Sequence, residues 1–301
     1  MQMRKPTGRV ISITYALKMF TICNMRRFVI FLLLCASVSI SQAQIVIDTL
    51  AYRFVYDVQA KIFEESSILS SDEHWLDIGK NGISSYYSRW KDEMSCIMDS
   101  LNRIGADFAD VSRICHEQGI ESSQFNYYVY KNDPTPGRQT IDFYSMECLQ
   151  YEEAMGQDWE FVEGDTIILN HPCHKAVCQY HGRIWTAFYA TDIPLSDGPW
   201  KLCGLPGLIL SAIDNDGAFV FHCVGIKQCK GEPMMRKMGK RRKLSPEIAH
   251  KLIEQIDSDP FAYMRSQGHT VQSFDEKGRP LDLSKIPRRA YYESYSMEDR
   301  K

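Results

Sequence analysis

Hydrophobic and polar residues alternate along several short stretches of the chain, which is the pattern of β-strands buried on one face only. In residues 49–60 (TLAYRFVYDVQA), Tyr52, Phe54 and Tyr56 fall on one face and Arg53 falls on the other, so we predict a strand there. The same pattern predicts further strands at 74–79, 84–88, 123–132 and 138–146, and a dense series of strands and turns from 159 to 226.

Two segments follow the helical period instead. Apolar residues recur three and four positions apart from 90 to 118, which predicts a helical insertion that is broken near Gly105. A C-terminal helix is predicted near 246–257, because Pro246 suits the first helical position and apolar residues line one face after it. We expect the tail from Pro260 onward to be mostly irregular.

The last predicted hairpin, turning at Asn215–Gly217, is apolar on both faces. Phe219 and Phe221 point one way, whereas Val220 and Val224 point the other way. Such a sheet must be covered on both sides, by helices on one side and by a second layer, its own curvature or a hydrophobic guest on the other. The predicted fold class is therefore α+β, mainly antiparallel β, with a strongly curved, half-barrel or bowl-like sheet and flanking helices.

The N-terminal residues have the pattern of a secretory signal peptide. Arg26 and Arg27 precede the apolar run 28–35, and small residues lead up to Ala43. We predict a signal peptide at 1–43 with Met25 as the true start, and a single mature domain at 44–301. The mature chain is then periplasmic or secreted after cleavage near Ala43. A true membrane anchor is the alternative, although the apolar run is shorter than the roughly 20 residues that span a bilayer.

Removal of residues 1–43 changes the charge of the chain. This segment carries Lys and Arg but no Asp or Glu, so 29 basic residues remain against 38 acidic ones, a net charge of −9 instead of −3. An acidic body repels phosphate backbones, which argues against nucleic acid as a partner. We expect no transmembrane segment in the mature chain.

The stretch from Gly198 to Leu210 (GPWKLCGLPGLIL), called the joint below, combines glycines, prolines and a closing aliphatic run. It is no P-loop, because neither lysine nor a hydroxyl residue follows Gly207. It is no nucleophile elbow, because neither serine nor cysteine stands between its last two glycines. We therefore predict an architectural role, in which prolines stiffen the path and Trp200 and Leu205 anchor it in the core.

The segment from Cys173 to Ile226 resembles the GLPGLI family of the Bacteroidota, whose hexapeptide stands here at Gly204–Ile209. The chain departs from the family pattern at Phe188, where tryptophan is usual. The joint matches the pattern at Gly198, Pro199, Lys201, Gly204, Leu205, Pro206, Gly207, Leu208 and Ile209. Before the joint, the chain matches it at Cys173, Lys175, Ala176, Gly182, Arg183, Ala187, Tyr189, Ile193 and Pro194.

This resemblance implies an exported envelope protein, in organisms rich in TonB-dependent outer-membrane receptors. It transfers no catalytic residue, because no activity is established for the family. We expect no cofactor.

The cysteines indicate some disulfide bonds. Ten cysteines become eight once residues 1–43 are removed, and an even number in an exported chain favours disulfides. The candidate disulfide cysteines are Cys173, Cys178, Cys203 and Cys223, with the connectivity open.

A denser group of candidate ligands stands at 171–181 (HPCHKAVCQYH). Thiolates and imidazoles are zinc ligands, so Cys173, His174, Cys178 and His181 form an alternative metal site. Neighbouring residues of a strand point to opposite faces, which weakens that alternative. A Cys/His nucleophile in the same cluster is the further alternative, and it would make the protein a hydrolase. Among the carboxylates, including Glu152 and Glu153, we single out no acid and base pair.

The basic run Arg236–Lys243 is interpreted as a solvated loop, with a contact to anionic lipid or to a partner as the alternative. Taken together, the sequence predicts an exported envelope protein, non-enzymatic, serving in binding or assembly. A hydrophobic ligand in the hollow of the sheet or an outer-membrane receptor component is the expected partner.

Overall fold

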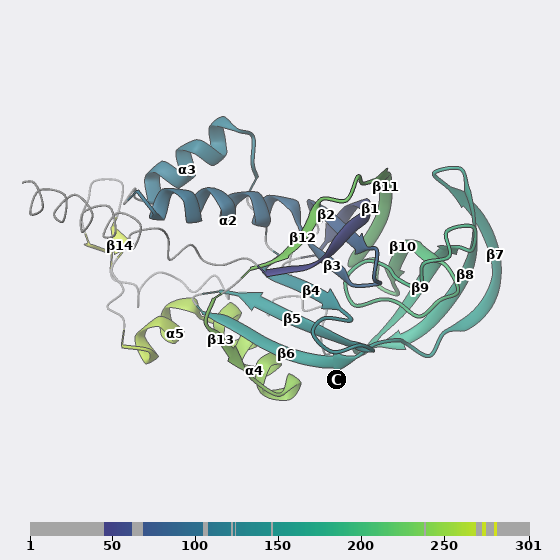
Figure 1. Cartoon of the computed structure of the whole chain (residues 1–301). Coiled ribbons are helices and arrows are strands. Elements are labelled where there is room, and N and C mark those ends of the chain that lie inside the picture. The colour runs from purple at the N-terminus through teal and green to yellow at the C-terminus, as the bar shows by residue number, and fades with distance from the viewer. Residues whose placement is uncertain are drawn as a thin grey trace, which may run out of the picture. The chain divides into compact units, whose positions relative to one another are not determined.

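A large antiparallel sheet forms most of the structure, which is a computed structural model (Figure 1). The structure describes residues 45–61, 69–104, 108–121, 123, 125–145, 147–237, 239–268, 273–274 and 280–281. The predicted leader at 1–43 lies outside these residues. No helix in the described part of the chain is both long and apolar enough to cross a membrane.

Thirteen strands make up the large sheet. The strands are β1 (Ile45–Ala60), β2 (Ser70–Gly79), β3 (Ser84–Ser88), β4 (Tyr127–Lys131), β5 (Arg138–Tyr144), β6 (Cys148–Ala154), β7 (Glu160–Ile168), β8 (His171–Tyr180), β9 (Arg183–Ala190), β10 (Leu208–Asp214), β11 (Phe219–Gln228), β12 (Pro233–Arg236) and β13 (Arg241–Lys243). Their order across the sheet is β13-β6-β5-β4-β3-β2-β1-β11-β10-β9-β8-β7, and β12 pairs with the start of β1. A separate two-stranded sheet joins β14 (Ser273–Phe274) and β15 (Pro280–Leu281).

Helices are few in the described part. They are α2 (Arg89–Asn102), α3 (Phe108–Glu117), α4 (Pro246–Ser258) and α5 (Pro260–Ser266). Helix α2 packs on β2, β3 and α3, whereas α4 packs on β6 and α5. The α2 N-terminus is capped by the Ser88 hydroxyl, which accepts from the Lys91 amide. Helix α5 corrects our expectation of an irregular tail from Pro260, since Asp259 caps it by accepting from the Ala262 amide.

The predicted fold class is wrong in two respects. The structure is mostly antiparallel β rather than α+β, and its sheet is open rather than a strongly curved half-barrel or bowl. β13 and β7 are its two ends, and no strand ladder within the described residues joins them. The prediction assumed that a second layer, curvature or a guest must cover the face of β11 that carries Val220, Val224 and Ile226, whereas Val224 and Ile226 stay 50% and 39% exposed.

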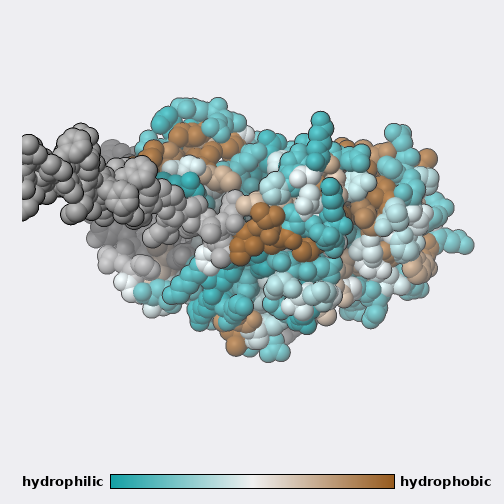
Figure 2. Space-filling view, viewed as in Figure 1, coloured by the Kyte–Doolittle hydropathy of each residue, from teal (hydrophilic) through white to brown (hydrophobic). Residues whose placement is uncertain are grey.

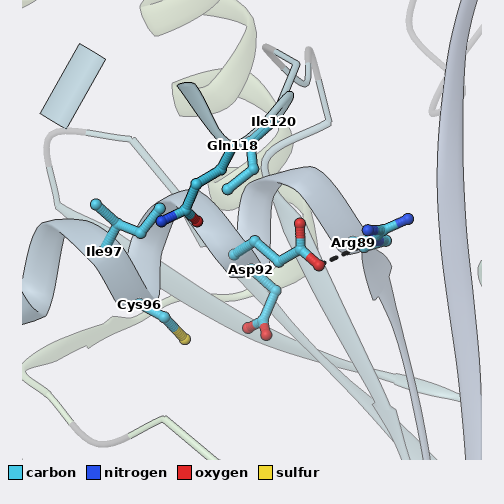
Figure 3. Close-up of a pocket in the computed structure, with 7 residues that line it drawn as sticks. Arg89, Asp92, Cys96, Ile97, Gln118 and Ile120 are labelled. Atoms are coloured by element: carbon cyan, nitrogen blue, oxygen red, sulfur yellow. Dashed lines mark hydrogen bonds and ion pairs between the residues drawn. The ribbon is translucent and has the colours of Figure 1, made fainter. Parts of the chain in front are cut away.

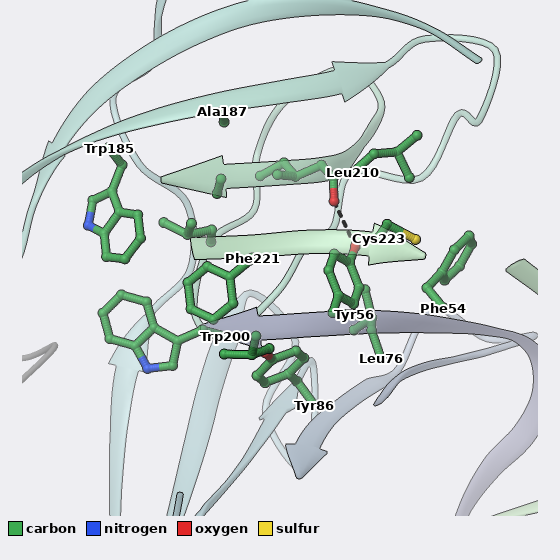
Figure 4. Close-up of a cluster of buried hydrophobic side chains, with 14 of the residues drawn as sticks. Phe54, Tyr56, Leu76, Tyr86, Trp185, Ala187, Trp200, Leu210, Phe221 and Cys223 are labelled. Atoms are coloured by element: carbon green, nitrogen blue, oxygen red, sulfur yellow. Dashed lines mark hydrogen bonds between the residues drawn. The ribbon is translucent and has the colours of Figure 1, made fainter. Parts of the chain in front are cut away.

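The joint packs on the buried face of the sheet. Trp200, Leu202 and Leu205 are almost completely buried, and they share one hydrophobic core with side chains of β1, β2, β9, β10 and β11 (Figure 4). The Tyr56 hydroxyl on β1 donates to the Ile209 carbonyl at 2.7 Å, which fastens the end of the joint to the middle of the sheet. The joint thus fills the buried face of the sheet.

Strand β1 holds the centre of the sheet together. Its alternating pattern is confirmed from Phe54 onward, because Phe54, Tyr56 and Val58 are buried while Gln59 is exposed. Tyr52 is 36% exposed instead, next to an irregularity in the pairing with β2 between Leu50 and Tyr52. It pairs with β11 on one side and with β2 on the other, so that Tyr56 lies between Cys223 and His74. The hairpin predicted around Asn215–Gly217 is also confirmed, and it joins β10 to β11.

Candidate functional site

Two buried lysines fix the joint to the sheet. The Lys131 ammonium group on β4 lies 2.5 Å from Asp197 Oδ1 and donates to the carbonyls of Gly198 and Leu202. Lys131 has no solvent exposure. A buried ammonium group is costly unless its hydrogens are all accepted, and here three acceptors take them. These bonds explain why the joint can follow an irregular path inside the core.

The second lysine, Lys201, belongs to the joint itself and is also completely buried. Its Nζ lies 3.0 Å from Glu153 Oε2 and 3.2 Å from the Tyr151 hydroxyl, and both of these partners come from β6. Glu153 on β6 is therefore the carboxylate that neutralises the positive charge of Lys201 in the joint.

Two imidazoles contact the same carboxylate. His181, in the turn between β8 and β9, places Nε2 3.6 Å from Glu153 Oε2. His250, on α4, places Nε2 3.5 Å from Glu153 Oε1. The side chains of Glu153, His181 and His250 keep 12%, 14% and 15% of their surface exposed, so the group reaches solvent at one side. We call Glu153, His181, His250 and Lys201 the Glu153 centre.

The electrostatics of this centre favour the ionised carboxylate. Burial by itself raises the pKa of Glu153, but hydrogen bonding to His181 and His250 and the charge of Lys201 lower that pKa well below its usual range. Glu153 is thus a permanent anion at neutral pH. It can hold cations and orient imidazoles, but it cannot serve as a proton donor.

Backbone strain accompanies the Glu153 centre. Trp200 (φ 50°) and His181 (φ 48°) both lie in the left-handed region, which bulky residues rarely occupy. The centroids of their rings are 5.8 Å apart, and the Trp200 ring also packs against the Trp185 ring, at 5.6 Å between centroids. The buried Trp200 Nε1 has no hydrogen-bond partner among the described residues. The packing around both residues therefore holds conformations that the isolated chain would avoid.

The predicted cluster at 171–181 is dispersed. His171 contacts Asp192 at 2.8 Å and His174 contacts Asp165 at 3.0 Å, both near the surface. Cys173 and Cys178 are buried in the core, and His181 alone reaches the Glu153 centre. No group of three or more His, Cys, Asp or Glu within the described residues is placed to hold a metal ion. At the Glu153 centre, the carboxylate of Glu153 is already paired with the ammonium group of Lys201.

The candidate disulfide cysteines are free thiols in the structure, as are all eight described cysteines. Cys173 and Cys178 belong to one strand, and the disulfide prediction gains no support. Burial raises the pKa of Cys178 and of Cys223 to about 12, and it also raises the pKa of Cys173 and Cys203. These thiols are therefore protonated at neutral pH and are poor nucleophiles.

The interpretation of the basic run as a solvated loop needs correction, because much of it folds back on the sheet. Arg236 pairs with Asp133, and Lys237 lies 2.9 Å from Asp92. Arg241 places Nε 2.8 Å from the buried carboxylate of Asp142. Arg236 and Lys237 also lie over the rings of Tyr130 and Tyr128, respectively, and Tyr128 stacks between Tyr130 and Tyr87.

A pocket of about 420 Å³ lies beside α2, away from the Glu153 centre. Figure 3 shows carboxylates, a thiol and aliphatic side chains around it. Its charges are already neutralised inside the chain, because Arg89 pairs with Glu93 at 2.8 Å and Asp92 pairs with Lys237. The pocket therefore offers no unsatisfied charge to a ligand.

Sequence reasoning missed Glu153 and His250 as members of a site. Glu153 was one carboxylate among many, and His250 falls on the apolar side of a helix that the sequence predicts only as packing. The signal that could have found them is the buried lysine of the joint, since Lys201 in a core segment requires an anion.

The model of one protein family, described as "Protein of unknown function (Porph_ging)", matches residues 121–211. The match is consistent with a Bacteroidota family and includes the hexapeptide at Gly204–Ile209, but it does not confirm the resemblance to the GLPGLI family. No curated protein matches the chain.

Two solved structures are similar to this chain at low identity. "Structure of PNGF-II in P21 space group" has a TM-score of 0.44 and 14% identity, over 68% of this chain and 33% of that chain. "Structure of PNGF-II in C2 space group" has a TM-score of 0.43 and 13% identity, over 68% of this chain and 32% of that chain. The chain thus spans about a third of the length of these PNGF-II chains.

Proposed function

We propose that this protein is an exported component of the cell envelope that acts by binding or assembly rather than by catalysis. The observation that carries the proposal is the complete burial of the joint, with Lys131 and Lys201 neutralised inside the core. The segment that carries the family-like motif is thus scaffolding. What remains for function is the surface of the sheet and its helices.

The chemistry of the interior supports a non-catalytic role. The core thiols are buried and protonated, so they offer no nucleophile. Glu153 is a permanent anion bound by three side chains, so it offers no exchangeable proton near neutral pH. The leader at 1–43 supports export. The joint fills the inner face of the sheet, and we therefore place binding on the outside of the molecule.

Export and assembly are tested separately. For export, N-terminal sequencing of the protein from the envelope fraction is expected to begin at Gln44. For assembly, native electrophoresis of gently solubilised envelopes is expected to show the protein in a species larger than its monomer. The variants His181→Gln and His250→Gln, if folded, should remain in that species. A monomeric protein that turns over a peptide or glycan, and loses this activity when His181 is changed, would overturn the proposal.

A hydrolytic enzyme is the second candidate, and one observation favours it. Two imidazoles and a carboxylate meet beside strained backbone and keep a solvent-facing edge. An imidazole oriented by a carboxylate is a common general base. Such an enzyme would have to use water as its nucleophile. Its activity would disappear in His181→Gln and His250→Gln while circular dichroism and melting temperature stay unchanged.

A further inference from the structure

An exposed apolar patch lies where β12 pairs with the start of β1. Val46 and Met235 are directly opposite each other on the two strands, and Ile45 is the next residue on β1. Val46 is 57% exposed, Ile45 is 48% exposed and Met235 is 38% exposed. Figure 2 shows an apolar area with hydrophilic residues beside it at the place where β12 and the start of β1 lie in Figure 1.

Three lysines that form no ion pair within the described residues belong to the segments that adjoin this patch. Lys80 is joined to the same part of β1 by the bond from its amide to the Thr49 carbonyl, at 2.9 Å. Lys230 stands three residues before β12, and Lys240 follows it in the connection to β13; all three lysines lie near or at the surface. Exposed Glu232 is the one carboxylate between Lys230 and Lys240 in the sequence. We call Ile45, Val46, Met235, Lys80, Lys230 and Lys240 the β1–β12 patch.

The structure separates these lysines from the rest of the basic run. Arg236, Lys237 and Arg241 are neutralised by carboxylates of the sheet and of α2, and they are therefore not available to a partner. The lysines of the β1–β12 patch, in contrast, are exposed and form no ion pair within the described residues, and the apolar side chains of the patch are also exposed. Exposed apolar side chains combined with unpaired amines are the surface chemistry of proteins that rest on anionic bilayers.

We propose that the β1–β12 patch docks on an anionic lipid surface, with Val46 and Met235 inserted between headgroups and the three lysines bound to phosphates. This inference rests on the proposed export. Ile45 follows in the chain directly after residues 1–44, which carry the apolar run 28–35, so the patch is the part of the mature domain next to the membrane-directed leader. The net charge of −9 over the mature chain opposes approach to an anionic surface, so that docking depends on the local lysines and apolar side chains of this patch.

The test is flotation of the mature protein with vesicles of phosphatidylcholine alone or of phosphatidylcholine with phosphatidylglycerol. We expect co-flotation with the anionic vesicles only, and weaker binding in higher salt because the lysines are screened. Each exposed lysine near an anionic surface contributes about fivefold to the partition coefficient. Lys230→Glu combined with Lys240→Glu should therefore lower it by about 25-fold or more.

Matched variants separate the patch from a general effect. Val46→Asp should abolish co-flotation, whereas Val224→Asp on β11, a residue of similar exposure (50%), should leave it unchanged. Lys251→Glu, on the exposed side of α4, is the control for charge. Equal binding of Val46→Asp and wild type, equal binding to both kinds of vesicle, or binding to an acidic polypeptide without binding to anionic vesicles would each overturn the inference. N-terminal sequencing reports on export independently, so an exported protein that fails to float refutes the docking and leaves the proposed function standing.

Discussion

Lys201 Nζ lies 3.0 Å from Glu153 Oε2, and this ammonium group has no contact with solvent. The pair joins a strand at one side of the sheet to the irregular segment that fills its inner face. Because removing one member of a buried pair leaves the other charge unmatched, Glu153 is the residue on which the position of the joint depends most directly.

Replacement of Glu153 by glutamine should therefore destabilise the protein, by about 3 kcal/mol at pH 7. The pKa of Glu153 is lower in the folded chain than its ordinary value of 4.5, despite burial, because His181, His250 and Lys201 stabilise the carboxylate. A carboxylate with a lowered pKa stabilises the fold at pH values above its unfolded pKa and loses this contribution as the pH falls. The difference in unfolding free energy between wild type and Glu153→Gln should shrink as the pH is lowered from about 5 to about 3, measured by urea unfolding. A difference that is constant over this range would contradict the assignment.

The Lys131–Asp197 pair should show strong coupling in a double-mutant cycle. Lys131→Met alone is expected to cost about 3 kcal/mol, because it strands Asp197 and two carbonyls in the core. Adding Asp197→Asn should recover at least about 1 kcal/mol. The exposed pair Arg113–Glu117, with 58% exposure of both side chains, is the control and should couple by less than about 0.5 kcal/mol. Equal coupling in the two pairs would show that burial is not the cause.

A methyl group at Gly207 should prevent the joint from packing against β9. A Cβ at this position would lie 2.2 Å from the Ala190 carbonyl oxygen, which is backbone and cannot rotate away. Gly207→Ala should lower the melting temperature by many degrees or abolish folding. Gly225→Ala is the matched control, because its Cβ would meet only the Val55 side chain at 3.6 Å. Similar melting temperatures for the two variants would refute the close approach of the joint to β9.

The thiols should differ sharply in reactivity. Cys96 is exposed, whereas Cys173, Cys178, Cys203 and Cys223 are buried. A chromogenic disulfide reagent at mildly alkaline pH should modify Cys96 first in the native protein. In denaturant without reductant, all eight cysteines of the mature chain should titrate as thiols. A lower count would restore the disulfide prediction, and peptide mapping would then identify the bonded pair.

The local pattern of the sequence was sufficient for individual strands. The alternation of Tyr52, Phe54 and Tyr56 predicts β1, and the turn residues at 215–217 predict the β10–β11 hairpin, because both depend on neighbours in the sequence. The pattern also predicts that the joint is structural. It gives the boundaries less well, since β1 begins at Ile45, ahead of the predicted start at Thr49.

The sheet order and the Glu153 centre could not be predicted from the sequence, because they depend on residues that are not neighbours in the chain. His181, His250 and Lys201 are far from Glu153 in the sequence, and their meeting depends on contacts between distant strands and a helix. Periodicity carries no information on such contacts. The curved sheet was predicted because an apolar face was expected to need a cover, but Val224 and Ile226 on the second face of β11 stay exposed. Trp200, Leu202 and Leu205 of the joint pack instead on the buried face.

The order of the strands has a consequence for the segment 121–211 that the family model matches. It supplies β4, β5 and β6 to one flank of the sheet and β7, β8, β9 and most of β10 to the other, and between these flanks run β3, β2, β1 and β11 from outside the segment. Expressed by itself, the segment would be two half-sheets with bare inner margins and no ladder between them. A fragment meant to isolate this unit must therefore extend from Ile45 to at least the end of β11, and sequence comparisons confined to 121–211 sample an incomplete folding unit.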